Sequence, residues 1–255
     1  MRRLKLVLEY DGTDYSGFQR QGRRPTVQAA LEAALKRVTQ KDTAVVAAGR
    51  TDAGVHATGQ VVHLDTGSLL ELSTLQRALN AVLPVDVVVR DIVEVGSEFH
   101  ARYSATSRHY RYTITNASVR SPLASRFTAH VAGPLNVADM QAAAMCLVGE
   151  HDFASFGGKM WVGGTTRRQV HSLDVSRSED LVLIDIAANA YLSRMVRSIA
   201  GCLIDVGLGG IRPDDVAGIL DARDRGLVRR LAPPQGLCLV KVDYPDSQLF
   251  VRSKG

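Results

Sequence analysis

Cysteine is scarce in this sequence, and the few cysteines present exclude two kinds of stabilising framework. The chain of 255 residues holds 3 cysteines, Cys146, Cys202 and Cys238. They stand far apart, form no C-x-x-C pair, and each lies in an apolar stretch where a small hydrophobic residue would serve equally well. We therefore expect neither disulfide bonds nor a cysteine-ligated metal.

The sequence also lacks the motifs that bind nucleotides and metals. It has no P-loop, no G-x-G-x-x-G fingerprint and no metal-ligand spacing. His56 and His63 invite a metal interpretation, but neither an H-x-x-x-H helix nor a cluster of cysteines accompanies them, so we expect both side chains to be structural. The sequence thus predicts a protein without a cofactor.

Long hydrophobic runs are missing as well. No apolar stretch approaches the length of a membrane span. The stretch that follows Arg2 and Arg3 is interrupted by Lys5, Glu9 and Asp11, so it forms no signal-peptide core. We expect a cytoplasmic protein.

Positive charge, by contrast, is abundant. The net charge is +5, and only 6 of the 31 basic residues are Lys, so the rest are Arg. The planar guanidinium group suits phosphate binding and base stacking, so the composition favours an acidic partner such as nucleic acid or an anionic membrane surface. A GC-rich genome, which favours Arg codons, would explain the same bias.

The pattern of hydrophobic residues predicts one element order twice. Thr26 is placed to cap the first helix, and Ser73 and Gln76 are spaced like a capping box before the second. The expected elements of the first round are a strand at 4–10, a helix at 26–40, strands at 43–48 and 60–66, a helix from about 73 and a strand at 85–95. The first round is therefore β-α-β-β-α-β.

A second round begins at Arg108. Its expected elements are a strand at 108–115, a helix capped by Asn136 that stops at Gly149, a hairpin of 170–176 and 181–187, a helix at 192–206, a short helix near Pro213 and a strand at 236–244. A helical wheel of 192–206 sets Arg194 and Arg197 together, opposite the apolar face, so Arg197 can point into a cleft.

Two βαββαβ rounds describe an α+β protein of two ferredoxin-like halves with antiparallel sheets, a layout that RNA-recognition domains also use. No low-complexity linker marks the junction, so the boundary is set near Ser104, where the first pattern ends. We predict an N-terminal α+β domain of residues 1–104 and a C-terminal α+β domain of residues 105–255.

The loop between the two middle strands of the first round carries the candidate chemistry. It reads Gly49-Arg50-Thr51-Asp52-Ala53-Gly54-Val55-His56-Ala57, with a carboxylate, a cation and an imidazole beside two glycines. From the pattern alone, a simple turn is the first interpretation, in which Asp52 caps its own backbone and Gly54 supplies a positive φ.

This loop and the T-G-Q-V-V-H that follows it resemble, nearly letter for letter, the signature of the tRNA pseudouridine synthase A family. Other segments resemble the same family in the same order and extend the likeness over essentially the whole chain: Asp11-Gly12-Thr13, Gly17-Phe18-Gln19, Thr26-Val27-Gln28, Phe99-His100-Ala101-Arg102, Arg108-His109-Tyr110-Arg111-Tyr112, Asp152-Phe153-Ala154-Ser155-Phe156, Met195-Val196-Arg197 and Val242-Asp243-Tyr244-Pro245. Phe18 stands where Trp is common in the family, and Ser198 where Asn is frequent.

The resemblance implies a fold, a reaction and a partner. The fold would be two similar halves facing each other across a basic cleft, with the second domain completing the active site and two chains forming a homodimer. The reaction would be the isomerisation of uridine to pseudouridine without a cofactor. The partner would be the anticodon stem-loop of tRNA, at positions 38 to 40, and no membrane would be involved.

The resemblance also implies roles for individual residues. Asp52 matches the catalytic aspartate, and Arg50 would fill the space left by the extruded uridine or contact its phosphate. Tyr110 matches the active-site tyrosine, whose ring would stack on uracil, although a tyrosine in a strand is commonly a packing residue. Arg197 matches the arginine that partners the carboxylate and would keep its pKa low.

Further arginines are candidates for contacts with the tRNA backbone, and each is also explicable as an ordinary surface charge. They are Arg20, Arg24, Arg108 and Arg111, together with Arg23, Arg167 and Arg168. Two other function classes stay open. A non-catalytic RNA-binding module or tRNA chaperone would explain the charge and the duplicated sheet, and a carboxylate-dependent hydrolase acting on nucleotides would use Asp52 differently.

Overall fold

The computed structural model describes residues 1–158 and 164–246, which divide into two compact units. The first unit holds Met1–Thr106 and the described residues from Leu239 onward, and the second holds Ser107–Cys238. The predicted boundary near Ser104 lies close to this division. Most of the closing strand, from Leu239 onward, belongs with the first unit, whereas the sequence-based division had put the whole strand in the second.

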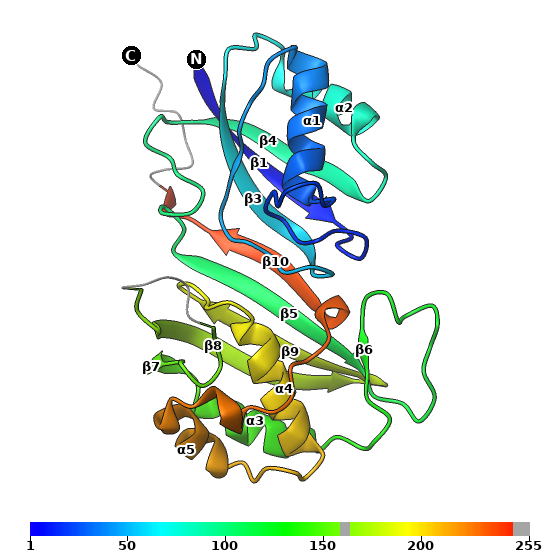
Figure 1. Ribbon diagram of the computed structural model, residues 1–255, viewed down its shortest axis with the longest axis vertical. Helices are drawn as coiled ribbons and strands as arrows, with labels where there is room; N and C mark the ends of the chain where they lie inside the picture. Colours follow the sequence, from blue (N-terminus) through cyan, green and yellow to red (C-terminus); the bar gives the residue numbers. More distant parts are fainter. Residues whose placement is uncertain (159–163, 247–255) are drawn as a thin grey trace. The chain divides into compact units, whose positions relative to one another are not determined.

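The first unit is built on an antiparallel sheet in the order β4-β1-β3 (Figure 1). Its long strands are β1 (Arg2–Tyr10), β3 (His56–Thr66) and β4 (Val87–Val95). Along β1 every second side chain is buried, as its alternating sequence predicts. The short β2 (Val46–Ala47) and β10 (Leu237–Asp243) pair with β3 on the edge that β1 leaves open.

Two helices, which pack against each other, accompany this sheet (Figure 1). In α1 (Val27–Thr39), the side chain of Thr26 accepts a hydrogen bond from the amide of Ala29, so the predicted N-cap is confirmed. The capping box predicted for α2 (Leu72–Val82) is wrong, because its N-cap is Glu71 and makes no side-chain cap. Gln76 instead donates to two carbonyl groups of β4 and ties the helix to the sheet.

In the second unit the strands follow the order β5-β9-β8-β7, and these neighbours are antiparallel. The strands are β5 (Ser107–Thr115), β7 (Gly149–Asp152), β8 (Arg167–Ser178) and β9 (Leu181–Ala188). β6 (Ala129–His130) pairs parallel to the end of β5. The predicted hairpin is therefore confirmed as β8 and β9, while β7 adds an edge strand that the sequence pattern did not predict.

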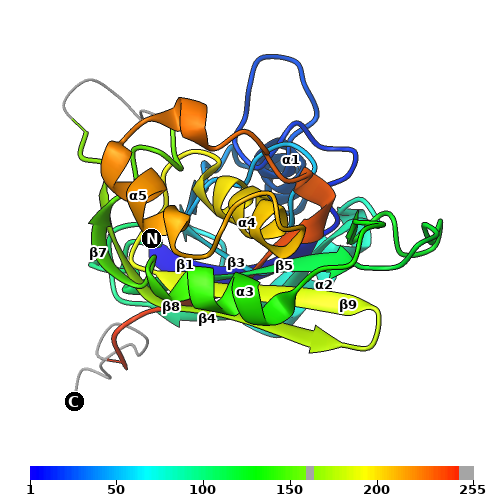
Figure 2. The same cartoon turned by 90° about the horizontal axis from the view of Figure 1, so that it is seen from below.

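The helices of this unit are α3 (Val137–Met145), α4 (Met195–Gly207) and α5 (Asp215–Ala222), followed by the 3₁₀ turns η1 (Arg225–Leu227) and η2 (Pro234–Gly236). Figure 2 shows α3 running alongside β8, which it contacts. Asn136 caps α3 as predicted, by accepting from the amide of Asp139. The described residues thus form a mixed α and β protein with five α-helices and mostly antiparallel strands.

Two further boundaries differ from prediction. The strand expected at 60–66 begins already at His56, so the loop before it is shorter than its sequence suggested. The helix expected at 192–206 begins at Met195, because Arg194 takes a left-handed conformation with φ 63°. Among the described residues, none of the helices combines the length and apolar character needed to cross a bilayer.

Candidate active site

The Asp52 loop of the first unit, defined here as residues 49–55, connects β2 to β3 and is held at both of its ends. The amide of Ala48 donates to Val61 (2.8 Å), and the carbonyl of Gly49 accepts from the side chain of Gln60 (2.9 Å). At the far end, the amide of Val55 donates to the carbonyl of Asp52 (3.2 Å), closing a turn in which Gly54 has φ 76°. Gly54 therefore has the positive φ expected from the sequence, and the Asp52 side chain is half-buried.

A second segment, residues 11–18, lies against this loop and reinforces it. The amide of Phe18 donates to the carbonyl of Thr51 (3.1 Å), and the amide of Gly54 donates to the carbonyl of Tyr15 (3.3 Å). A Cβ atom on Gly12 would stand 2.0 Å from the carbonyl oxygen of Val55, so only glycine permits this approach. The two sequence segments are therefore two sides of one backbone framework around Asp52.

His56 fastens the end of the loop to the same segment. Its Nδ1 atom lies 3.0 Å from the amide nitrogen of Gly12 and 3.2 Å from a carboxylate oxygen of Asp11, and the ring is buried. His63, farther along β3, accepts from the amide of Ala101 (3.1 Å). Each histidine ring therefore accepts a hydrogen bond from a backbone amide of another segment, which is the structural role expected of both.

The predicted arginines of the first unit differ in their surroundings. Arg50 precedes the Asp52 loop turn and is exposed, as is Arg24. Arg20 forms an ion pair with the buried Glu32 of α1, and its own backbone amide donates to Gln28 (3.0 Å). Arg20 therefore lies next to the loop framework with its guanidinium group engaged, whereas Arg24 extends into solvent.

In the second unit, Tyr110 lies on β5 with its side chain buried. Its ring meets the ring of Tyr191 edge to face, with centroids 5.2 Å apart and planes at 90°. The hydroxyl of Tyr191 donates to the carbonyls of Arg108 (3.0 Å) and Ile186 (3.1 Å), and burial raises its pKa well above the ordinary value. Tyr191 thus fixes the ring of Tyr110, a role that the sequence pattern did not reveal.

Arg197 lies in the first turn of α4 and holds the chain before η2. Its Nε atom donates to the carbonyl of Ala232 (2.8 Å), and its own carbonyl accepts from the amide of the same residue (3.1 Å). Tyr112, on the same face of β5 as Tyr110, donates to the next carbonyl, that of Pro233 (2.9 Å). Arg197 and Tyr112 therefore hold neighbouring carbonyls of one segment, and Tyr110 lies two residues before Tyr112 on β5.

The helical wheel was wrong about Arg194, which stands before the first residue of α4 and does not share a helical face with Arg197. Its left-handed backbone conformation is uncommon for a residue with a side chain. The preceding turn is fixed by Gly157, where a Cβ atom would lie 2.2 Å from that of Leu192. A bridge between Gly158 and Ser193 adds to this constraint, so the start of α4 is set by the segment at 157–158.

The remaining predicted arginines are engaged in the second unit. Arg108 is buried and donates to the carbonyl of Asn189 (2.5 Å), and Arg168 is buried and donates to the carbonyl of Thr165 (2.9 Å). Arg111 is exposed and forms two hydrogen bonds with the carboxylate of Asp185 (2.8 and 3.0 Å). The side chains of Arg108 and Arg111 thus point to opposite faces of the sheet at β5.

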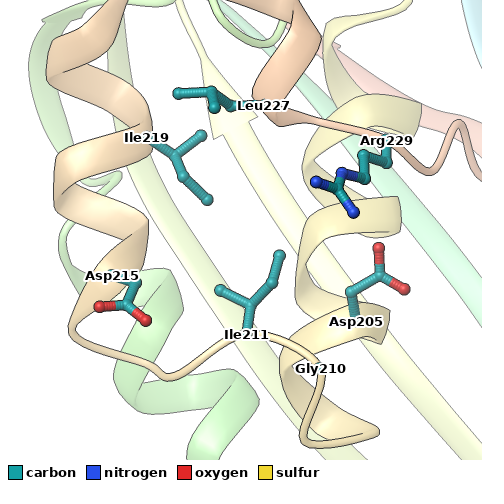
Figure 3. A pocket seen from close by; sticks show the side chains of 7 residues that line it. All are labelled: Asp205, Gly210, Ile211, Asp215, Ile219, Leu227 and Arg229. Atoms are coloured by element: carbon teal, nitrogen blue, oxygen red, sulfur yellow. The ribbon is translucent and has the colours of Figure 1, made fainter.

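A cavity of about 470 Å³ also lies in the second unit, and none of the predicted site residues lines it (Figure 3). It is lined by Asp205, Gly210, Ile211, Asp215, Ile219, Leu227 and Arg229. Both carboxylates on its wall are engaged, Asp205 with Arg230 and Asp215 with Arg212. Within residues 1–158 and 164–246, moreover, no group of three or more His, Cys, Asp or Glu side chains is arranged to hold a metal ion.

The sequence of this chain matches a known class of enzyme. Residues 6–104 and 143–245 match the family model described as tRNA pseudouridine synthase. The chain therefore belongs to the tRNA pseudouridine synthase family. The matched segments include Arg50, Asp52 and Arg197, while Tyr110 lies between them.

Two relatives illustrate the extent of the likeness, and both are named tRNA pseudouridine synthase A. The protein from Geotalea uraniireducens (strain Rf4) is 47% identical over 244 residues, which cover 96% of this chain and 100% of the relative. That from Shewanella amazonensis is 44% identical over 245 residues, covering 96% and 94%. A solved Cbf5-Nop10-Gar1 complex contains a chain that is 14% identical with a TM-score of 0.37, covering 79% of this chain and 45% of that one.

Proposed function

We propose that this protein isomerises uridine to pseudouridine in tRNA and that Asp52 is the essential carboxylate. The observation that carries the proposal is the Asp52 loop, which is braced by two backbone segments within a matched part of the chain. Rigid support of this kind is what a reacting group needs, because small displacements of a catalytic group are costly. A simple surface turn would not need a second segment packed against it as closely as Gly12 packs against Val55.

The chemistry sets what the site must supply. The N1–C1′ bond breaks, the uracil turns while still held, and C5 bonds to C1′; N1 gains a proton and C5 loses one. Atoms and electrons balance without an oxidant or a co-substrate. The reaction therefore needs an anionic carboxylate, a flat surface for the everted base and protection of the intermediate from water.

Within this scheme we assign Asp52 to the reacting sugar and base, and Tyr110 and Arg197 to the same reaction. The ring of Tyr110 offers a stacking surface already fixed by Tyr191, and its hydroxyl can take or give a proton. Arg197 would keep the carboxylate ionised. Tyr110→Phe separates the two tyrosine roles, because phenylalanine retains the ring and its contact with Tyr191 but cannot transfer a proton.

The substrate uridines would be those at positions 38 to 40 of the anticodon stem-loop, as the likeness in sequence suggests. Arg50 would occupy the space that the everted uridine leaves. Arg20, Arg24 and Arg111, which are exposed, would contact the tRNA backbone, and such contacts weaken as salt concentration rises. Arg108, also predicted from the sequence as a backbone contact, is buried and holds the carbonyl of Asn189 instead. A homodimer in the cytoplasm is the assembly that we propose.

The element order also supports two related halves. The first unit has the order β1-α1-β2-β3-α2-β4 and a sheet in which β1 lies between β3 and β4, as a ferredoxin-like unit requires. In the second unit β5, α3, β8, β9 and α4 follow the first five elements of the same order, with β6, β7 and α5 as additions. We propose that both derive from one βαββαβ plan.

The test is a reaction with purified protein, unmodified tRNA transcript and EDTA, without nucleotide. We expect mass spectrometry of the digested tRNA to detect pseudouridine, and mapping to assign it to positions 38 to 40. Tight tRNA binding without pseudouridine would favour a chaperone. Release of free uracil would instead favour a hydrolase, since an isomerase retains the base.

A further inference from the structure

A buried group of three polar side chains lies beneath the Asp52 loop. The hydroxyl groups of Tyr10 and Thr51 are 2.8 Å apart, and the Nε2 atom of Gln60 lies 3.5 Å from the Tyr10 oxygen. The same Nε2 atom donates to the carbonyl of Gly49 (2.9 Å). We call these three residues the Tyr10 cluster; they come from β1, the loop and β3.

Each member of the Tyr10 cluster is almost completely buried. The exposed fractions are 3% for Tyr10, 6% for Thr51 and 0% for Gln60. A buried polar group without a hydrogen bond destabilises the fold. The three side chains are therefore held in the positions that keep their hydrogen bonds. The cluster therefore ties the backbone at Gly49 and the side chain of Thr51 to the two central strands.

The strand register explains how Tyr10 reaches the loop. Leu8 pairs with Gln60 but Tyr10 pairs with Ala57, so β3 has one more residue than β1 between these two pairs. Such a bulge bends the strand and re-aims its side chains, and bulges are common beside active sites. The ring of Tyr10 also packs against that of Phe18, with centroids 6.2 Å apart, and the amide of Phe18 holds the carbonyl of Thr51.

We propose that Tyr10 and Gln60 are positioning residues for the reaction, acting through Thr51 and Gly49 on Asp52. The proposal rests on the catalytic role proposed above for Asp52. Asp52 follows Thr51 directly, so its backbone is fixed on one side by the cluster and on the other by the turn to Val55. The cluster holds the carboxylate in place and makes no contribution of its own to tRNA binding.

The first test is Tyr10→Phe, which removes one hydroxyl group and keeps the ring. We expect the single-turnover rate of pseudouridine formation at saturating enzyme to fall at least about tenfold, while the Kd for tRNA stays within about twofold. The rate can be followed as tritium released from tRNA labelled at C5 of uridine, because that hydrogen leaves as the new bond forms.

Tyr244→Phe is the matched control. Tyr244 is also a buried tyrosine of the first unit, and its hydroxyl donates to the carbonyl of Ala101 (2.8 Å) away from the loop. Both variants lose a buried hydrogen bond, so we expect similar decreases in Tm. Only Tyr10→Phe should slow the reaction, and equal losses of rate would reduce the Tyr10 cluster to a purely structural role.

Thr51 supplies a rescue experiment that does not depend on tyrosine. Thr51→Val has nearly the same shape but no hydroxyl, and we expect it to slow the reaction as Tyr10→Phe does, with the double variant no slower than either single one. Thr51→Ser restores the hydroxyl and should restore most of the rate. If Thr51→Ser were as slow as Thr51→Val, the hydrogen bond would not be the cause.

Asp52→Asn, measured alongside, distinguishes the two proposals. An inactive Asp52→Asn together with an unchanged rate in Tyr10→Phe would overturn the positioning role and leave the catalytic one intact. An active Asp52→Asn would overturn the proposed function itself, whatever the result for the Tyr10 cluster.

Discussion

Gly17 lies with its backbone directly against the carbonyl group of Thr51. With φ 95°, it places the position of a missing Cβ atom 2.7 Å from that oxygen. Gly17 and Thr51 are far apart in the sequence, and Thr51 directly precedes Asp52. A single glycine therefore limits how far the Asp52 loop can move.

Gly17→Ala tests this contact. The substitution adds a strained positive φ, which costs about 1–2 kcal/mol, and also pushes against backbone that cannot move easily. We therefore expect the free energy of unfolding to fall by more than the cost of the strained φ alone, and we expect the reaction to be slower. Urea denaturation and single-turnover kinetics measure the two effects.

Gly22→Ala provides the comparison for this prediction. Gly22 also has a positive φ of 52°, but no atom lies within 4 Å of its missing Cβ. We expect it to lose about 1 kcal/mol of stability and to keep its rate. If both substitutions changed the rate equally, the contact between Gly17 and Thr51 would not be what positions the Asp52 loop.

A second prediction concerns Arg20 and Arg24. Arg20→Ala removes the ion-pair partner of the buried Glu32, so we expect a loss of about 1 kcal/mol in stability, a value reduced because Arg20 is itself exposed. Arg24→Ala should change stability by less than about 0.5 kcal/mol. Both should weaken tRNA binding and lower the slope of log Kd against log salt by about one.

Filter binding over a range of salt concentrations measures that slope, and thermal or chemical denaturation measures stability. A normal slope in Arg24→Ala would remove Arg24 from the proposed RNA contacts. Unchanged stability in Arg20→Ala would mean that Glu32 is satisfied by its hydrogen bonds from Gln28 and Val45 alone.

The third prediction is a pH dependence that originates at His63. Burial, the neighbouring His100 and the charge of Arg3 lower the pKa of His63 to about 4, from an ordinary value of 6.5. Between these two values the unfolded chain takes up a proton that the folded chain does not. Stability is therefore fully present above about pH 6.5 and is lost as the pH falls toward 4.

The expected contribution to the slope is at most about 1.4 kcal/mol per pH unit, the value for one proton. His63→Gln should reduce the slope between pH 6.5 and 5, even though the loss of ring contacts with Phe99 and His100 lowers stability at pH 7. Urea denaturation at several pH values measures this. Parallel curves for the variant and the wild type would contradict the assignment to His63.

Much of the fold could be predicted because its signals are local. The alternation along residues 4–10 predicts β1 since a half-buried strand repeats every two residues. The caps at Thr26 and Asn136 depend on an amide three residues away, so the sequence carries them as well. The positive φ of Gly54 in the Asp52 loop could likewise be predicted, because it follows from the residue type at that position.

What could not be predicted depends on partners distant in the sequence. Gln76 looked like half of a capping box, but its side chain reaches the carbonyls of β4. The closing strand pairs with β3, most of a chain length away, and no local pattern marks that choice. Tyr191 and the Tyr10 cluster were missed for the same reason, because an edge-to-face ring or a buried hydroxyl pair leaves no periodic signal.

The most direct test of the central claim is the single-turnover conversion of uridine to pseudouridine by Asp52→Asn, compared with Asp42→Asn as an exposed control that pairs with Lys36. The two amides have the same shape as the carboxylates they replace. We predict that Asp52→Asn binds tRNA and unfolds like the wild type but forms no pseudouridine, while Asp42→Asn reacts normally. Pseudouridine formation by Asp52→Asn at the wild-type rate would contradict the account.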